Sequence, residues 1–320
     1  MQKKQLVLNL LVLLLVGLMV GASQLLGEPE IIFPEITALA VGAWLAPRQP
    51  WRVSRPMMFL LITAFSVLGV LLNLYLPVPL MFRVLLAFFI CQAALTLCGT
   101  TFAPLISAAI LPILLSTRSW VYPLSSSAMT LLIVAGQFLM EKSGMRAPQE
   151  RTVPIPLRQR IGLQQLTGWL KLLGCASLVI VPALCLGANF CIAPPLLVGF
   201  TELANPESPA RKRPGVLVLL VFACALAGST SRLVFTQTLG LPLTVSALIA
   251  TALALTLMQG LKFYFPPAGA VAVLPFLLPS SILWMYPIQA GLGFIALTGI
   301  ALGLFRPAAD YAASRRQVSE

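Results

Sequence analysis

Long apolar runs separated by short polar breaks dominate this sequence. Runs of ~16–23 apolar residues are long enough, as helices, to cross the ~30 Å hydrocarbon core of a bilayer. The pattern therefore predicts an all-α, polytopic transmembrane bundle. The expected helices are Gln5–Leu26, Met57–Leu76, Leu80–Leu97, Ala103–Leu115, Trp120–Met140, Leu170–Phe190, Gly215–Phe235, Pro242–Met258, Pro266–Leu278 and Leu283–Phe305.

Two further apolar segments, Phe33–Leu45 and Pro194–Leu203, are too short to cross as straight helices. We interpret them as broken or re-entrant segments whose ends are buried by neighbouring helices. With them, the bundle has about 10–12 membrane segments.

The two halves of the chain share a series of prolines and aromatic residues in the same order. Phe102-Ala103-Pro104 corresponds to Phe265-Pro266-Pro267, and Trp120-x-Tyr122-Pro123 corresponds to Trp284-x-Tyr286-Pro287. A spacing of ~160–165 residues indicates one unit present twice. We therefore expect two pseudo-symmetric repeats, at 1–140 and 170–305, joined by a basic linker at 141–169 and followed by a polar tail at 306–320.

Composition supports the membrane class. Hydrophobic residues make up 59% and charged residues 9% of the chain, with a mean hydropathy of +0.95, whereas soluble domains have about 25% charged residues. We interpret the net charge of +12 as a sign of how the chain is oriented in the membrane, because basic loops stay on the cytoplasmic side. It gives no reason to expect nucleic acid as a partner; the expected partner is the lipid bilayer.

Charge also predicts the orientation of the helices. Six crossings per repeat place the basic loops and both termini in the cytoplasm, and make the repeats parallel in the cell membrane. A re-entrant short segment would make the count odd and the repeats inverted. The chain has no His, and its six Cys lack metal-ligand spacing. We therefore expect no metal, no cofactor and no enzymatic activity.

The start of the segment Pro266–Leu278 is a candidate binding site. Pro266 and Pro267 suit the first turn of a helix, and Ala268 and Gly269 keep that turn slim. The amides and the dipole at a helix start favour an anion. The alternative is that the prolines only make a tight turn. Similar starts occur at Pro104 and at Pro194-Pro195.

Charged residues within apolar runs are functional candidates by default. Glu202 and Glu35 are candidate coupling groups. The alternative for Glu202 is an interfacial ion pair, and the alternative for Glu35 is that it does no more than cap a helix. Arg83 and Arg232 are candidates for attracting an anion, or they extend to the headgroups. Lys262 is either an anion ligand beside Pro266 or a cytoplasmic anchor.

Two segments resemble a known family. Ala252–Gly269, which ends in Phe-Pro-Pro-Ala-Gly, is similar to the signature of the HPP family of integral membrane proteins, whose motif is His-Pro-Pro-Ala-Gly. Ala193–Pro209 resembles the family's second element, which begins with Ala-Pro and ends with Ser-Pro. Phe265, and Phe102 in the first repeat, replace the family's His, so a role of that His is not inherited. The resemblance implies a transporter, and some members are linked to nitrite.

These observations predict a transporter or channel for a small solute. A small, nitrite-like anion bound near helix starts at the repeat interface is the leading hypothesis. A transporter of a cation or a neutral metabolite that uses Glu202 and Glu35 is the first alternative. A membrane assembly subunit or a membrane enzyme is the second. The sequence leaves homo-oligomerisation open.

Overall fold

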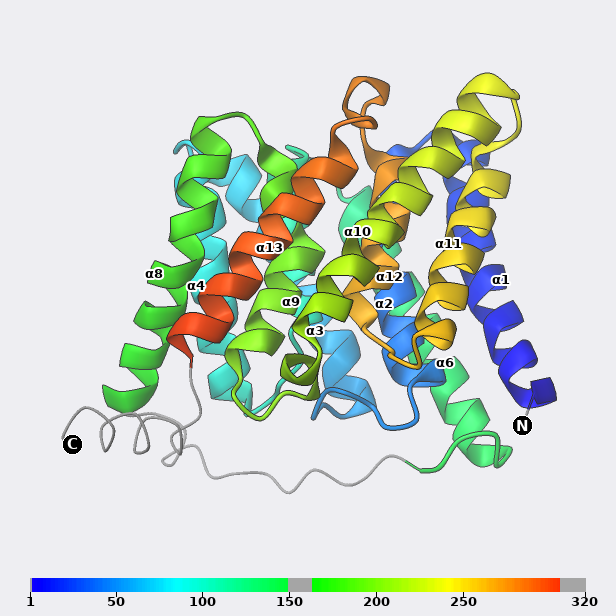
Figure 1. The fold of residues 1–320 in the computed structure, drawn as a ribbon, viewed down its shortest axis with the longest axis horizontal. Coiled ribbons are helices and arrows are strands. Elements are labelled where there is room, and N and C mark those ends of the chain that lie inside the picture. The colour runs from blue at the N-terminus through cyan, green and yellow to red at the C-terminus, as the bar shows by residue number, and fades with distance from the viewer. Residues whose placement is uncertain (1, 149–162, 306–320) are drawn as a thin grey trace.

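The computed structural model describes residues 2–148 and 163–305, and these residues form helices and connecting loops without a strand (Figure 1). Within this described part, eight helices are long and apolar enough to span a membrane. In the first half they are α1 (Gln2–Leu26), α3 (Arg55–Tyr75), α4 (Leu80–Cys98) and α6 (Val121–Lys142). In the second half they are α8 (Leu163–Cys185), α10 (Pro214–Ser231), α11 (Leu243–Gly260) and α13 (Tyr286–Leu304). The chain is thus a multi-pass membrane protein.

Four short helices lie among the long ones. They are α2 (Glu35–Ala40), α5 (Pro104–Leu114), α9 (Pro194–Ala204) and α12 (Pro266–Val273). Short helical turns extend or precede several elements: η1 (Pro29–Ile31), η2 (Val41–Leu45), η3 (Asn189–Ile192), η4 (Pro209–Lys212), η5 (Arg232–Thr238), η6 (Leu274–Leu277) and η7 (Ser280–Ile282). Eight spans and four short helices confirm the predicted polytopic bundle.

Two of the expected spans are shorter than predicted. The segment expected as Ala103–Leu115 is the 11-residue helix α5, and eight residues of Pro266–Leu278 form α12. At ~1.5 Å per residue, neither helix crosses a bilayer core alone. Proline explains both starts: Pro104 and Pro266 each occupy the first helical position, where the missing N–H costs nothing.

The expected linker at 141–169 is shorter at both ends, because α6 continues to Lys142 and α8 begins at Leu163. Residues 149–162 and the tail 306–320 lie outside the described residues, so the rest of those two predictions stays untested.

The two halves repeat the same contacts. In the first half the Tyr122 hydroxyl donates to the carbonyl of Ala108 at 3.2 Å, and in the second the Tyr286 hydroxyl donates to that of Val271 at 2.9 Å. The ring of Tyr122 packs edge-on against Phe33, as the ring of Tyr286 does against Phe190. Equivalent contacts of these tyrosines therefore occur in both halves.

The halves are intertwined. Helix α2 packs against α12, and α9 packs against α5, so each short helix that opens a half contacts a short helix of the other half. At the periphery, α1 packs against α11 and α8 against α4 (Figure 1). The short helices therefore hold the two halves together from the inside. The expected boundary at 141–169 divides the sequence into two halves, but these halves are not separately packed domains.

The direction of the chain is visible in Figure 1. Helix α1 begins and α13 ends at the lower edge of the view, and α8 also begins there. The two halves therefore run through the bundle in the same direction. This arrangement corresponds to the parallel alternative of the sequence analysis; which edge faces the cytoplasm stays a prediction.

Candidate functional site

The starts of the four short helices meet around one small cavity. Each helix contributes two residues that lie one turn apart on the same face. These residues are Glu35 and Ala38 of α2, Pro104 and Ser107 of α5, Pro195 and Val198 of α9, and Pro267 and Ala270 of α12. We call this region the junction. Its cavity of about 10 Å³ has room for about one water molecule.

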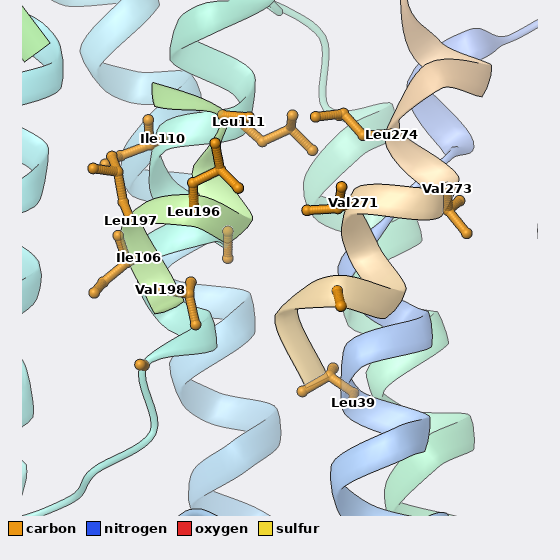
Figure 2. Packing of buried hydrophobic residues seen from close by; sticks show 14 of the residues in the cluster. Leu39, Ile106, Ile110, Leu111, Leu196, Leu197, Val198, Val271, Val273 and Leu274 are labelled. Carbon is orange, nitrogen blue, oxygen red and sulfur yellow. The ribbon is translucent and has the colours of Figure 1, made fainter. Parts of the chain in front are cut away.

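The short helices enter the junction from opposite directions. In Figure 2, α5 rises from Ile106 to Leu111 and α12 rises from Val271 to Leu274, whereas α9 descends from Leu196 to Val198. The Leu, Ile and Val side chains labelled in Figure 2 are fully or almost fully buried. An apolar shell therefore surrounds the cavity.

Polar groups reach the cavity wall from the first half of the chain only. Glu35 is 2% exposed, and its Oε1 accepts a hydrogen bond from the Ser107 hydroxyl. Its Oε2 is buried without a hydrogen-bond partner in the described structure. Glu35 is the one charged side chain among the residues that line the cavity.

Trp51 forms the remaining part of the wall. It lies in the loop between η2 and α3, is 3% exposed, and packs edge-on against Phe102 with ring centroids 5.4 Å apart. Its indole Nε1–H donates to Oε1 of the half-buried Glu202 at 3.0 Å. Glu202 belongs to α9, so this hydrogen bond joins the two halves just outside the cavity.

The Pro-Pro start of α12 offers fewer donors than the sequence suggested. Pro266 and Pro267 have no N–H, and the amide of Ala268 donates to the carbonyl of Phe265 at 3.1 Å. At α9 the amide of Leu196 likewise donates to the carbonyl of Ala193 at 2.7 Å. Of the amides expected to be free in the first turn of α12, that of Ala268 is thus already used, and the helix dipole also favours an anion there.

The predicted binding residues divide into two groups. Pro104, Pro195 and Pro267 line the cavity. Pro194, Pro266, Ala268 and Gly269 are buried but do not line it. Gly269 instead allows α12 to approach α2, since a Cβ there would lie 3.0 Å from the Thr37 Cγ2.

The predicted basic residues lie away from the cavity. Lys262 is exposed in the loop between α11 and α12. Arg83 donates to Oδ1 of Asn73 at 2.6 Å. Arg232 donates to the carbonyls of Pro275 and Leu278, at the end of the α12–η6 segment, where a positive charge also complements the helix dipole.

Sequence reasoning did not single out Trp51 or Ser107. A tryptophan in a loop rich in proline and arginine resembles an interfacial residue, and a serine in an apolar helix has no distinctive signal. Only the repeat alignment could have helped, because Ser107 follows Pro104 by one turn as Ala270 follows Pro267. Among the described residues, no group of three or more His, Cys, Asp or Glu side chains could hold a metal ion.

Comparison with known proteins gives one match. The family model of the HPP transmembrane region matches residues 198–311. No curated protein and no solved structure matches the chain. The matched region contains α10–α13 and most of α9, and the rest of the described chain continues the same pattern of apolar helices. The second half of this membrane protein is therefore similar to the transmembrane region of the HPP family.

Proposed function

We propose that the protein is a transporter for a small solute and that the solute crosses the membrane through the junction. The observation that carries the proposal is the meeting of four short helix starts around one cavity between the two halves. Secondary transporters commonly bind their substrates at interrupted helices between structural repeats. Transport is favoured over catalysis because the cavity wall carries one carboxyl and one hydroxyl group in an otherwise apolar lining.

The leading candidate solute is a small anion of the size of nitrite. The positive ends of the helix dipoles at the junction favour negative charge, and the resemblance of the motifs points the same way. Because two prolines and the bonded amide of Ala268 leave few free donors at the start of α12, the dipoles would supply most of the attraction.

A small cation is the second candidate. Glu35 is the specific observation that favours it, because an unpaired carboxylate on a cavity wall attracts positive charge. Glu202 contributes less to this alternative, since its Oε1 already accepts the Trp51 indole N–H.

Uptake into proteoliposomes tests the proposal. The panel consists of nitrite, nitrate and formate, and of sodium, potassium and ammonium, each with and without a pH gradient. The variant Ala270→Leu fills the cavity wall, whereas Ala296→Leu adds the same bulk to an exposed position of α13. We expect uptake of one solute class, its loss in Ala270→Leu and its retention in Ala296→Leu. Equal uptake by both variants, or no uptake above empty vesicles for any solute, would refute the proposal.

A further inference from the structure

Glu35 occupies an unusual position for a carboxyl group. It is the first residue of α2, it is 2% exposed, and its Oε2 has no hydrogen-bond partner in the described structure. Its other oxygen accepts from Ser107. Both residues line the cavity of the junction, which has room for one water molecule. A water there would give the buried oxygen the partner it lacks.

No cation compensates the carboxyl group from the elements packed against α2. Those elements are α1, α5, α6, α12 and η2. Of these, α5, α12 and η2 contain no ionisable side chain. The ionisable residues of the other two are Lys3 and Lys4, at the exposed start of α1, and Tyr122, Glu141 and Lys142 of α6.

The ionisable groups of α6 and of nearby α13 have other partners. Glu141 forms an ion pair with Arg55 at 3.2 Å, at the opposite end of α6 from Tyr122. The Tyr122 hydroxyl donates to the carbonyl of Ala108, and the Tyr286 hydroxyl donates to that of Val271. A carboxylate buried without a positive partner is expensive, so Glu35 needs either a proton or a bound cation.

The size and chemistry of the cavity favour the proton. A metal ion without its hydration shell would need several oxygen ligands, and most of the wall is proline, alanine and valine. A hydrated ion does not fit into about 10 Å³. One water molecule beside Oε2 is enough to deliver or remove a proton.

The second half of the chain shows that the fold does not require this carboxyl group. In the cavity wall, Pro195 and Val198 of α9 take the places that Glu35 and Ala38 of α2 take, so the residue that corresponds to Glu35 is Pro195. The matching bonds of Tyr122 and Tyr286 assign Ala270 to Ser107. The second half thus packs the same site with two apolar side chains, and the polar pair has a role other than closing the bundle.

We infer that Glu35 and Ser107 form a proton-binding site on the solute path. A protonated water in the cavity gives its proton to Oε2 of the carboxylate, an O–H bond forms there, and neutral water remains. Ser107 fixes the other oxygen and so points Oε2 at the cavity. The inference rests on the proposed transport function and deepens it, because a proton taken up at this site would travel with the solute.

Infrared difference spectroscopy of the purified full chain in lipid, between acidic and alkaline pH, tests the site without any transport. We expect a carbonyl stretch of a protonated carboxylic acid that is lost in Glu35→Gln, shifted in Ser107→Ala and kept in Glu202→Gln. Glu35→Asp keeps an acid group at this position and should therefore show the band at a shifted frequency. This result would show that loss of the band in Glu35→Gln comes from loss of the acid group and not from a change of residue 35 as such. A band that survives unchanged in a folded Glu35→Gln protein would overturn the inference.

A transport measurement adds the second arm. In proteoliposomes with an inward proton gradient, we expect Glu35→Gln to lose the stimulation of uptake by the gradient and Glu202→Gln to retain it. An acid band at Glu35 in a protein that transports nothing would refute the proposed function and leave the proton site standing. Uptake that shows the same gradient stimulation in Glu35→Gln would refute the proton site and leave transport standing.

Discussion

At the scale of single residues, the hydrogen bond between Trp51 and Glu202 is the contact that most directly joins the two halves beside the cavity. Hydrogen bonds to charged groups contribute about 1.5–3 kcal/mol, and the partial exposure of Glu202 places this one at the lower end. We predict that Trp51→Phe and Glu202→Ala each destabilise the protein. The double variant should lose about 1–2 kcal/mol less free energy of unfolding than the two single variants lose together.

Thermal unfolding of the four proteins in detergent measures this coupling. Phenylalanine keeps an aromatic ring against Phe102, so the cycle isolates the indole N–H. Strictly additive losses would show that the hydrogen bond does not join the halves in solution.

Sequence reasoning at this scale singled out charged residues in apolar segments and missed residues whose type is ordinary for their segment. Glu35 was singled out because a carboxylate in an apolar segment is expensive, and the structure puts it on the cavity wall. Lys262 met the same criterion, yet it lies exposed in a loop. Ser107 and Trp51 have their positions only through contacts between distant segments, which leave no local pattern.

At the scale of elements, one close contact between helices occurs in both halves. Gly69 of α3 lies against the carbonyl of Ala109 in α5, and Gly228 of α10 lies against that of Ala272 in α12. A Cβ at either glycine would overlap a backbone oxygen, which cannot move away as a side chain can. We predict that Gly69→Ala and Gly228→Ala each destabilise the protein by about 1–3 kcal/mol.

Gly174→Ala is the matched control for this pair, because nothing lies within 4 Å of a Cβ at Gly174 in α8. In open space, alanine favours a helix over glycine by about 1 kcal/mol. The unfolding temperature should therefore fall in the two close-contact variants and stay level or rise in the control. A loss in only one half would mean that the two contacts are not equivalent.

Helix positions were largely predictable, because apolar length and proline mark them directly. The expected Leu80–Leu97 and the observed α4 (Leu80–Cys98), for example, differ by one residue. The packing of α2 on α12 and of α9 on α5 was not predictable. Helices that are apolar on nearly all sides carry no stripe that identifies the partner. The repeat suggested an interface between the two halves, and in the structure the short helices form part of it.

At the scale of the whole molecule, the parallel course of the two halves makes a prediction about the membrane. Because α1 begins and α13 ends at the same edge of the bundle (Figure 1), both ends of the described chain must lie on one side. The loop that carries Arg48, Arg52 and Arg55, and the segment Arg211–Arg213, lie between helices that meet at this same edge. Basic loops remain in the cytoplasm, so we expect that side to be cytoplasmic.

Reporter fusions decide the orientation. A fluorescent protein that folds only in the cytoplasm, joined before Gln2 or after Leu304, should be bright in both cases. The same reporter inserted at Gly240, in the loop between η5 and α11, should be dark, because that loop lies at the opposite edge. One bright and one dark terminus would require an odd total number of crossings, which would contradict the course of the chain in Figure 1. A reporter inserted before Leu163, at the start of α8, distinguishes parallel from inverted halves and should also be bright, because α1 and α8 begin at the same edge. A dark reporter there would mean an odd number of crossings in each half and inverted halves, which would contradict the observed directions of the short helices and remove the basis for the proposed transport path.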